Sequence, residues 1–383
     1  GDIGSTTLFE DYVRKQSNQV KRSAGLPNDT HLWRIVIKPF AEWMGQNATG
    51  RILSEKAHEI IEAALPGKSV ILLQEMERHW LLTKVPHYTK GGKVSGHEYR
   101  FPYQRFSDHL IVRYLLNHHL KRTGDPKSYF AKHTPLGRIL SPLYPWHIRS
   151  GLIEAMAIQV PERLEGVELI DVASAKFKRT STAESSFLNS LLWRDLEMRN
   201  GVWRYFDKLK IIKHINFYAR GNATRDGFDA VLMTVLSTAG IANHPLDAEI
   251  LHAFLSKRTM PKRDEFWIPF LYYQYGEDGS VIDRYLNWTS SKLVRKLKSK
   301  QVILQTGIVL SWLLASSHRE LRDRATKSLV NLLDGRYAII KELLQKFDGV
   351  DDLYILERLY AVAYGCALRE TRPSKLKTLA LYI

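Results

Sequence analysis

The chain has 383 residues, of which 44% are hydrophobic and 25% are charged, and this balance excludes an intrinsically disordered protein. Lys and Arg (56) outnumber Asp and Glu (40), and the formal net charge of +16 suits an anionic partner, so binding of nucleic acid through a basic surface is one hypothesis. The sequence has no signal peptide and no apolar run long enough to span a bilayer, which predicts a cytoplasmic protein without a membrane partner.

The two ends of the sequence lack the usual marks of a complete chain. It begins with Gly1 instead of Met, and it ends within the apolar run 376–383, so we interpret it as part of a longer polypeptide. The single cysteine, Cys366, has no partner for an internal disulfide and lies among apolar positions of an expected helix. We therefore predict a buried thiol with a structural role.

Residues 1–50 are predicted to form a helical segment. Apolar residues recur at spacings of three and four over 7–20 and again over 31–44, which is the period of an amphipathic helix.

The next segment, 51–120, has the order of elements found in a winged-helix domain. Ser54 is expected to cap its first helix, and a glycine-rich hairpin separates two apolar strands. The predicted elements are a helix over 54–65, a short helix or strand over 70–73, and strands over 80–85 and from 99 onward.

A strand and a helix are predicted to meet without a loop near Gln104. Tyr99, Phe101 and Tyr103 alternate with the period of a strand, and the apolar residues from Phe106 onward recur with the period of a helix. Such a junction fixes the orientation of the two elements relative to each other.

The remaining sequence predicts only helices, so the fold class is mainly α. Residues 121–290 are expected to form a helical domain, with no strand between 126 and 288. Residues 291–383 are expected to begin an α-solenoid of the HEAT or TPR type, because helices of similar length follow one another there. These predicted helices cover 301–316, 318–333, 336–347 and 353–367, and the first is apolar on nearly all sides.

Motifs for catalysis and metal binding are incomplete. Residues 65–69 (LPGKS) are similar to the end of a phosphate loop, but Glu62 stands where that motif requires glycine, so we interpret the segment as a helix end. A short segment contains two acids and a lysine, as nuclease sites do: Glu168, Asp171 and Lys176. The acid that such a site places two residues before its lysine is missing. We therefore assign no catalytic residue, no metal ligand and no cofactor to this chain, and predict that it is not an enzyme by itself.

The helix over 54–65 would be the DNA-reading helix if this domain bound duplex DNA. Glu55, Glu59 and Glu62 are expected on its exposed side, where their carboxylates would repel phosphates. A nucleic-acid-binding winged-helix and helical-repeat protein is the alternative function, and the net charge is the feature that favours it.

The segment 101–110 (FPYQRFSDHL) resembles the strand-to-helix signature that closes the winged-helix domain of STAND-type NTPases, including the NACHT-bearing immune ATPases. Segments 152–163, 260–267 with 274–276, and 313–329 resemble bacterial antiviral STAND proteins of the Avs (AVAST) group. The resemblance covers most of the chain and rests on the shared order of these motifs.

This resemblance implies that an effector and an ATPase precede the chain in the full-length protein and that helical repeats of a sensor follow it. ATP and Mg²⁺ would belong to the full-length protein, which would recognise a phage protein such as a terminase or portal subunit, self-associate and activate the effector. In many NACHT proteins a His of the winged helix contacts the nucleotide. When Phe106 and Asp108 are aligned, Tyr103 occupies that position and is the candidate nucleotide contact, with a core or hinge tyrosine as the alternative.

Overall fold

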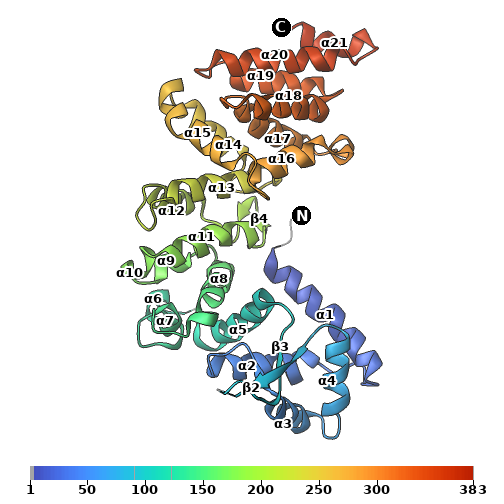
Figure 1. Ribbon diagram of the computed structural model, residues 1–383, viewed down its shortest axis with the longest axis vertical. Coiled ribbons are helices and arrows are strands. Elements are labelled where there is room, and N and C mark those ends of the chain that lie inside the picture. The colour runs from blue at the N-terminus through green and yellow to red at the C-terminus, as the bar shows by residue number, and fades with distance from the viewer. Residues whose placement is uncertain (1–3, 90, 122, 383) are drawn as a thin grey trace. The chain divides into compact units, whose positions relative to one another are not determined.

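The computed structural model describes residues 4–89, 91–121 and 123–382 (Figure 1). Over these residues the protein is mainly α: 65% of it is helical, with 21 α-helices, and a small three-stranded antiparallel sheet lies near the N-terminus. None of the helices in this described part combines the length and the apolar character that crossing a membrane requires. The chain divides into two compact units, one ending at Gly227 and the other beginning at Phe228. The expected domain boundaries after residues 50, 120 and 290 stay predictions.

The N-terminal unit begins with the two helical stretches that the sequence predicts. They are α1 (Ser5–Ser23), followed by a π-helical turn (Trp33–Ile37) that continues into α2 (Lys38–Gln46). Val13 and Val20 of α1 are buried. They recur at the spacing of one helix face, and α1 lies beside α4 in Figure 1.

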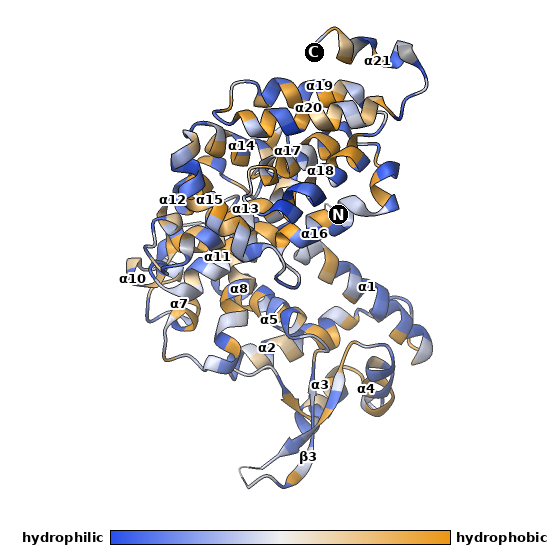
Figure 2. Cartoon of the chain, turned by 45° about the horizontal axis from the view of Figure 1, so that its top comes forward, coloured by the Kyte–Doolittle hydropathy of each residue, from blue (hydrophilic) through white to orange (hydrophobic). Residues whose placement is uncertain are grey.

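A small sheet with two helices follows. Strand β3 lies between β1 and β2 and is antiparallel to both, with Ile52 opposite Tyr99 and Thr83 opposite Arg100. Figure 2 shows the β2–β3 hairpin extending away from the helices of this unit. The elements are β1 (Ile52–Leu53), α3 (Ser54–Ala64), α4 (Ser69–Arg78), β2 (Thr83–Tyr88) and β3 (Val94–Arg100).

The predicted order of a helix, a short helix or strand, and two hairpin strands is confirmed, although the prediction lacks β1, and β3 begins at Val94 instead of residue 99. Two further details are wrong. Ser54 is the first residue of α3 and does not cap it, because Leu53 occupies the N-cap position without a side-chain hydrogen bond. The strand also does not run directly into the helix. Strand β3 ends at Arg100 and α5 (Gln104–His119) begins after three connecting residues, the last of which, Tyr103, is the N-cap. Alternation of aromatic residues there reflects burial of Phe101 and exposure of Tyr103, not strand pairing.

The rest of the N-terminal unit is helical except for one hairpin. Helix α8 packs on both α5 and α11, and its Leu152, Met156 and Val160 are fully buried. The elements are α6 (Pro126–Tyr129), α7 (Pro135–Leu140), α8 (Trp146–Arg163), α9 (Leu169–Val172), α10 (Ala175–Lys178), α11 (Ser181–Trp193), β4 (Met198–Arg199), β5 (Val202–Trp203) and α12 (Lys208–Ala219).

The hairpin β4–β5 contradicts the prediction of no strand between 126 and 288. Its two-residue turn consists of Asn200 and Gly201, with φ angles of 53° and 76°. Asn-Gly is the preferred sequence for a hairpin turn with two positive φ angles, and the prediction overlooked this signal because each strand is only two residues long.

The C-terminal unit consists of packed helices. Helix α17 contacts α14, α18, α19 and α20, and ten of its fourteen residues are buried, so it forms the centre of this unit (Figure 2). The four helices predicted after residue 300 are confirmed. The elements are α13 (Gly227–Ala239), α14 (Ala248–Ser256), α15 (Met260–Gln274), α16 (Val281–Ser290), a 3₁₀ turn (Lys292–Lys296), α17 (Lys300–Leu313), α18 (Arg319–Leu333), α19 (Tyr337–Phe347), α20 (Leu353–Ala367) and α21 (Pro373–Ala380).

Candidate functional site

A groove of about 540 Å³ opens at the N-terminus of α5. Its walls come from the segment before β1, the end of β3, the first turns of α5 and the start of α8. The polar side chains that line it are Thr49, Arg51, Arg100, Gln104, Ser107, Asp108 and His147. The first backbone N–H groups of an α-helix have no partner within the helix, so the helix end and the two arginines together favour an anion.

Two buried acids accompany these basic side chains. Glu98 is buried next to the groove, forms an ion pair with Arg51 (2.6 Å) and is in hydrogen-bond contact with Nδ1 of His87 (3.0 Å). Arg51 is therefore held in place while most of its side chain stays exposed.

Asp108 is a buried carboxyl group in the wall of the groove. Its Oδ2 has no hydrogen-bond partner among the described residues, and burial, with a smaller contribution from Glu154, raises its pKa to about 7. A Cβ atom on Gly151 would lie 1.9 Å from this Oδ2, so glycine at that position of α8 makes room for the carboxyl group. Near neutral pH Asp108 is partly protonated, and its protonated form can donate a hydrogen bond.

Tyr103 lies between Pro102 and Gln104, which both line the groove. Its side chain is 61% exposed, so the interpretation of Tyr103 as a core residue is wrong. Its carbonyl oxygen accepts a hydrogen bond from the backbone N–H of Ser107, which holds the chain at the start of α5. Burial raises the pKa of Tyr12, and the nearby phenol of Tyr103 raises it further. The contact between Tyr103 and a nucleotide stays a prediction.

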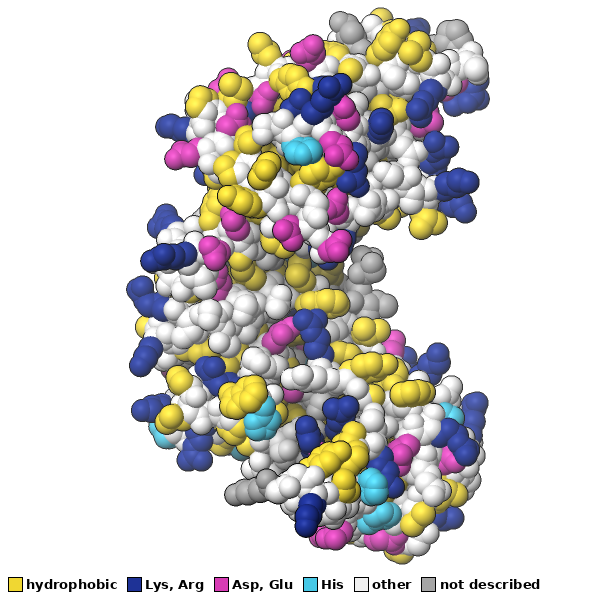
Figure 3. All heavy atoms as spheres, in the orientation of Figure 1, with side chains coloured by type: hydrophobic (Ala, Val, Ile, Leu, Met, Phe, Trp, Pro, Cys, Tyr) yellow, Lys and Arg dark blue, Asp and Glu magenta, His cyan; other side chains and the backbone are white. Residues whose placement is uncertain are grey.

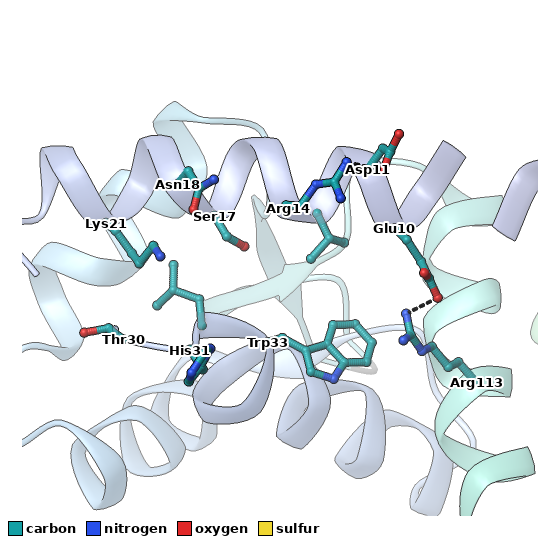
Figure 4. Close-up of a pocket in the computed structure, with 12 residues that line it drawn as sticks. Glu10, Asp11, Arg14, Ser17, Asn18, Lys21, Thr30, His31, Trp33 and Arg113 are labelled. Atoms are coloured by element: carbon teal, nitrogen blue, oxygen red, sulfur yellow. Dashed lines mark hydrogen bonds and ion pairs between the residues drawn. The ribbon is translucent and has the colours of Figure 1, made fainter. Parts of the chain in front are cut away.

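A second groove, of about 330 Å³, lies between α1 and the start of the π-helical turn (Figure 4). The guanidinium group of Arg113 lies 4.3 Å from the ring centre of Trp33 and forms an ion pair with Glu10 at 2.8 Å. Arg14 is paired with Asp11 in the same wall. Both acids in this wall are already paired with arginines, so this groove is a weaker candidate for a charged ligand, and no sequence pattern predicts it.

The segment similar to a phosphate loop is a turn between α3 and α4, as its interpretation as a helix end predicts. Gly67 has a φ angle of 73°, and the carboxylate of Glu62 accepts hydrogen bonds from the backbone N–H groups of Gly67 (2.6 Å) and Ser69 (3.1 Å). Glu62 thus occupies the backbone donors that a phosphate would need.

The three residues with nuclease-like chemistry are not brought together. Glu168 pairs with Arg194 in the interior, whereas the carboxylate of Asp171 lies 2.8 Å from Nε2 of His214. Over residues 4–89, 91–121 and 123–382, no three His, Cys, Asp or Glu side chains form a group that could hold a metal ion. The structure therefore separates these acids into two structural pairs.

A basic and aromatic surface lies where α10 and α12 meet, and we name it the α10–α12 surface. Lys178 Nζ lies 4.9 Å from the ring centre of Phe217, and the guanidinium carbon of Arg179 lies 5.8 Å from it. Burial lowers the pKa of Lys178; Lys213 adds to this effect and Asp171 opposes it.

Other basic side chains are held in structural contacts. Arg263 is fully buried and pairs with Asp352 at 2.8 Å. Near the 3₁₀ turn, Arg336 donates hydrogen bonds to the carbonyl oxygens of Val294, Arg295 and Leu297. Figure 3 shows basic and acidic side chains interspersed over the face that it draws, so the excess positive charge does not form one continuous patch on that face.

Comparison of the chain with protein-family models, with curated proteins and with solved structures found no match.

Proposed function

We propose that this chain is the regulatory and sensor portion of a STAND-type antiphage defence NTPase of the Avs group, acting in the cytoplasm. Residues 51–120 would form its winged-helix domain, 121–290 a helical domain, and 291–383 the first helical repeats of the HEAT or TPR type. The observation that carries the proposal is the order β1–α3–α4–β2–β3 leading into α5, with the family-like segment 101–110 at the last connection. Packed helices of similar length in the C-terminal unit add support.

The groove at the start of α5 supports a role in sensing the nucleotide. Arg51, Arg100 and His147 line it beside a helix N-terminus, and this set of groups fits a phosphate. Tyr103 would approach the same phosphate from the connection before α5, because its phenol is exposed and can donate one hydrogen bond. ATP and Mg²⁺ would be held by the ATPase of the full-length protein, and the isolated chain would hydrolyse nothing.

The proposed mechanism is a shift between two arrangements. In the resting protein the winged helix packs on the nucleotide-bound ATPase, and binding of a phage terminase or portal protein to the helical repeats favours a second arrangement that self-associates. Helix α5 follows β3 after only three residues and packs on α8, so a rotation of the small sheet would be transmitted to the helices behind it.

Substitution of Tyr103 in the full-length protein tests the nucleotide contact. We expect Tyr103→Phe to weaken retention of the nucleotide and to raise effector activity without the phage protein, since one hydrogen bond to phosphate is lost. Tyr88→Phe is the matched control, because Tyr88 is also exposed but lies on the hairpin. Unchanged resting activity and unchanged target response in Tyr103→Phe would rule out the contact. ATP hydrolysis by the isolated chain would contradict the proposal that only the ATPase of the full-length protein hydrolyses ATP.

The second candidate is a nucleic-acid-binding protein, and the α10–α12 surface favours it. Cationic groups beside an aromatic ring suit a phosphate backbone with unstacked bases. The exposed Glu55 and Glu59 on α3 argue against insertion of that helix into a major groove.

Binding of fluorescent single-stranded and duplex DNA over a range of salt concentrations separates the two functions. If this candidate is right, affinity falls steeply with salt, and the double substitution Lys178→Gln and Arg179→Gln reduces the slope of log K against log salt by about 1–2. Lys292→Gln with Lys296→Gln, in the 3₁₀ turn, is the control. Absence of salt-dependent binding leaves the STAND proposal as the better one.

A further inference from the structure

A small cavity of about 160 Å³ lies between the first turns of α1, the start of α5, the middle of α8 and the end of α11. Its walls are mostly apolar, and they include Leu8, Phe9, Ala155, Ile158 and Trp193. The polar side chains that line it are Ser5, Arg105, His109 and Glu154. The cavity does not include the basic side chains of the groove at the α5 N-terminus.

The hydrogen bonds of Gln159 fix the tautomer of His109. The amide nitrogen of Gln159 lies 3.0 Å from the carbonyl oxygen of His109 and 3.1 Å from its Nδ1. Since a carbonyl oxygen only accepts, this amide nitrogen must be the donor, and Nδ1 must then be the acceptor. The amide oxygen of Gln159 faces a guanidinium nitrogen of Arg163 at 3.5 Å, which agrees with this orientation. The proton of the neutral ring therefore lies on Nε2.

The Nε2–H group is a buried donor, and no described protein group accepts its hydrogen bond. His109 is only 2% exposed, and burial, followed by the nearby charges of Arg113 and Arg163, lowers its pKa to about 3. The ring thus stays neutral at physiological pH. A buried donor without an acceptor is costly, so an acceptor in the cavity would be stabilised.

The rim of the cavity carries balanced charges. Arg105 and Glu154 both line it and form an ion pair at 2.9 Å. Arg105 also lies over the ring of Trp193, at 5.2 Å from its centre. Leu8 and Trp193 are both exposed, so the apolar interior is open to solvent along this side. Because His109 is neutral and Arg105 is paired with Glu154, the site has no net charge with which to bind an ion.

We propose that this cavity binds a small uncharged organic molecule with a ring-sized apolar body and one oxygen that accepts a hydrogen bond from Nε2 of His109. A cavity of about 150 Å³ with apolar walls is large enough for a benzene ring. The oxygen acceptor satisfies the buried donor, and Phe9 and Trp193 provide aromatic contacts for the ring. This inference does not depend on the proposed function.

The test uses this chain with ¹⁵N-labelled histidine and three ligands of nearly the same shape. Acetophenone has a ring and a carbonyl oxygen, α-methylstyrene replaces that oxygen by CH₂, and benzoate replaces the methyl group by an anionic oxygen. We expect acetophenone to shift the His109 Nε2–H resonance saturably with a dissociation constant of about 1 mM or lower. α-Methylstyrene should bind about tenfold more weakly for lack of one hydrogen bond, and benzoate should also bind more weakly because its charge loses water.

Equal affinity for acetophenone and α-methylstyrene, tighter binding of benzoate, or no saturable shift with acetophenone at about 5 mM would each overturn the proposal. His109→Phe should abolish the difference between acetophenone and α-methylstyrene, with binding followed by isothermal titration calorimetry because this variant lacks the His109 resonance. If that variant does not fold, Leu8→Ser tests the location, because Leu8 is an exposed wall residue whose loss should weaken all three ligands. Leu143→Ser, the same change at an exposed position outside the lining, should leave all affinities unchanged. Identical affinities in Leu8→Ser and the unsubstituted chain would place the ligand elsewhere and overturn the site.

Discussion

Glu168 and Arg194 form a two-point ion pair inside the N-terminal unit. The distances Oε1–Nη1 and Oε2–Nη2 are both 2.8 Å, and the two side chains are 1% and 0% exposed. Arg194 also donates hydrogen bonds to Oγ of Ser190 and to the carbonyl oxygen of Tyr205. The pair therefore ties the residue before α9 to the residue after α11, and each charge is compensated only as long as the other is present.

Removal of one member of this pair should strongly destabilise the N-terminal unit. Arg194→Met leaves the carboxylate of Glu168 buried without its partner, and we expect a loss of about 3–5 kcal/mol in the free energy of unfolding. Urea denaturation followed by circular dichroism measures it. Arg14→Met is the control, because the pair of Arg14 with Asp11 is exposed and should change stability by no more than about 0.5 kcal/mol. A loss below about 1 kcal/mol for Arg194→Met would contradict the assigned role of the pair.

The buried carboxyl group of Asp108 should make stability depend on pH. Its pKa is raised from 3.8 to about 7 in the folded state, so the folded protein retains a proton that the unfolded chain releases. This stabilisation is fully present below a pH of about 4 and is lost as the pH rises through about 7. Asp108→Asn, which stays neutral, should match the unsubstituted chain at the acid end and exceed its stability by about 4 kcal/mol at a pH of about 8, because a rise of about 3 in the pKa corresponds to about 4 kcal/mol.

Urea denaturation of both proteins across this pH range measures the difference. Glu162, whose pKa burial also raises to about 7, and His109, whose pKa burial lowers to about 3, titrate in both proteins and cancel in the comparison. A stability difference between Asp108→Asn and the unsubstituted chain that does not change with pH would show that the carboxyl group is not retained in its protonated form.

The only cysteine should be unreactive while the C-terminal unit is folded. Cys366 is fully buried, and burial raises the pKa of its thiol to about 12, so about one thiol in ten thousand is ionised near pH 8. We expect Ellman's reagent to react slowly with the native chain and rapidly in urea. The control is Leu368→Cys in a Cys366→Ala background, because Leu368 is an exposed position at the end of the same helix. Equal native reaction rates at the two positions would contradict the burial of Cys366.

Because α17 and α19 approach each other closely at Gly307, replacement of this glycine should destabilise the C-terminal unit. A Cβ atom on Gly307 would lie 2.7 Å from Cδ1 of Leu343, which is itself buried. Gly307→Ala raises helix propensity by about 1 kcal/mol but overpacks this contact, and we expect a net loss of about 1 kcal/mol in the free energy of unfolding.

A double-substitution cycle with Leu343→Ala tests this assignment by urea denaturation. The smaller side chain makes room for the added methyl group, so Gly307→Ala should become neutral or stabilising in that background. Gly365→Ala is the control, since its Cβ would lie 3.4 Å from Cγ2 of Val330, an ordinary contact distance. A stabilising Gly307→Ala in the otherwise unchanged chain would be the contradictory result.

Local features of the chain depend on short-range patterns, and the sequence predicts them well. The helix over 54–64, the four helices after residue 300 and the burial of Cys366 all follow from apolar residues at helical spacing, which any neighbour in the fold would bury in the same way. The Asn200–Gly201 turn is likewise encoded locally, by a dipeptide that favours two positive φ angles.

The chemical state of individual side chains was decided only by tertiary contacts. Asp108 retains a proton near neutral pH because Gly151 of α8 lets the carboxyl group approach, and His109 has a fixed tautomer because Gln159 lies beside it. Period and propensity describe which face of an element is buried. They do not contain the position of a partner that is 40 to 50 residues away along the chain, and for a buried polar group that partner determines its protonation, its hydrogen bonds and its stability.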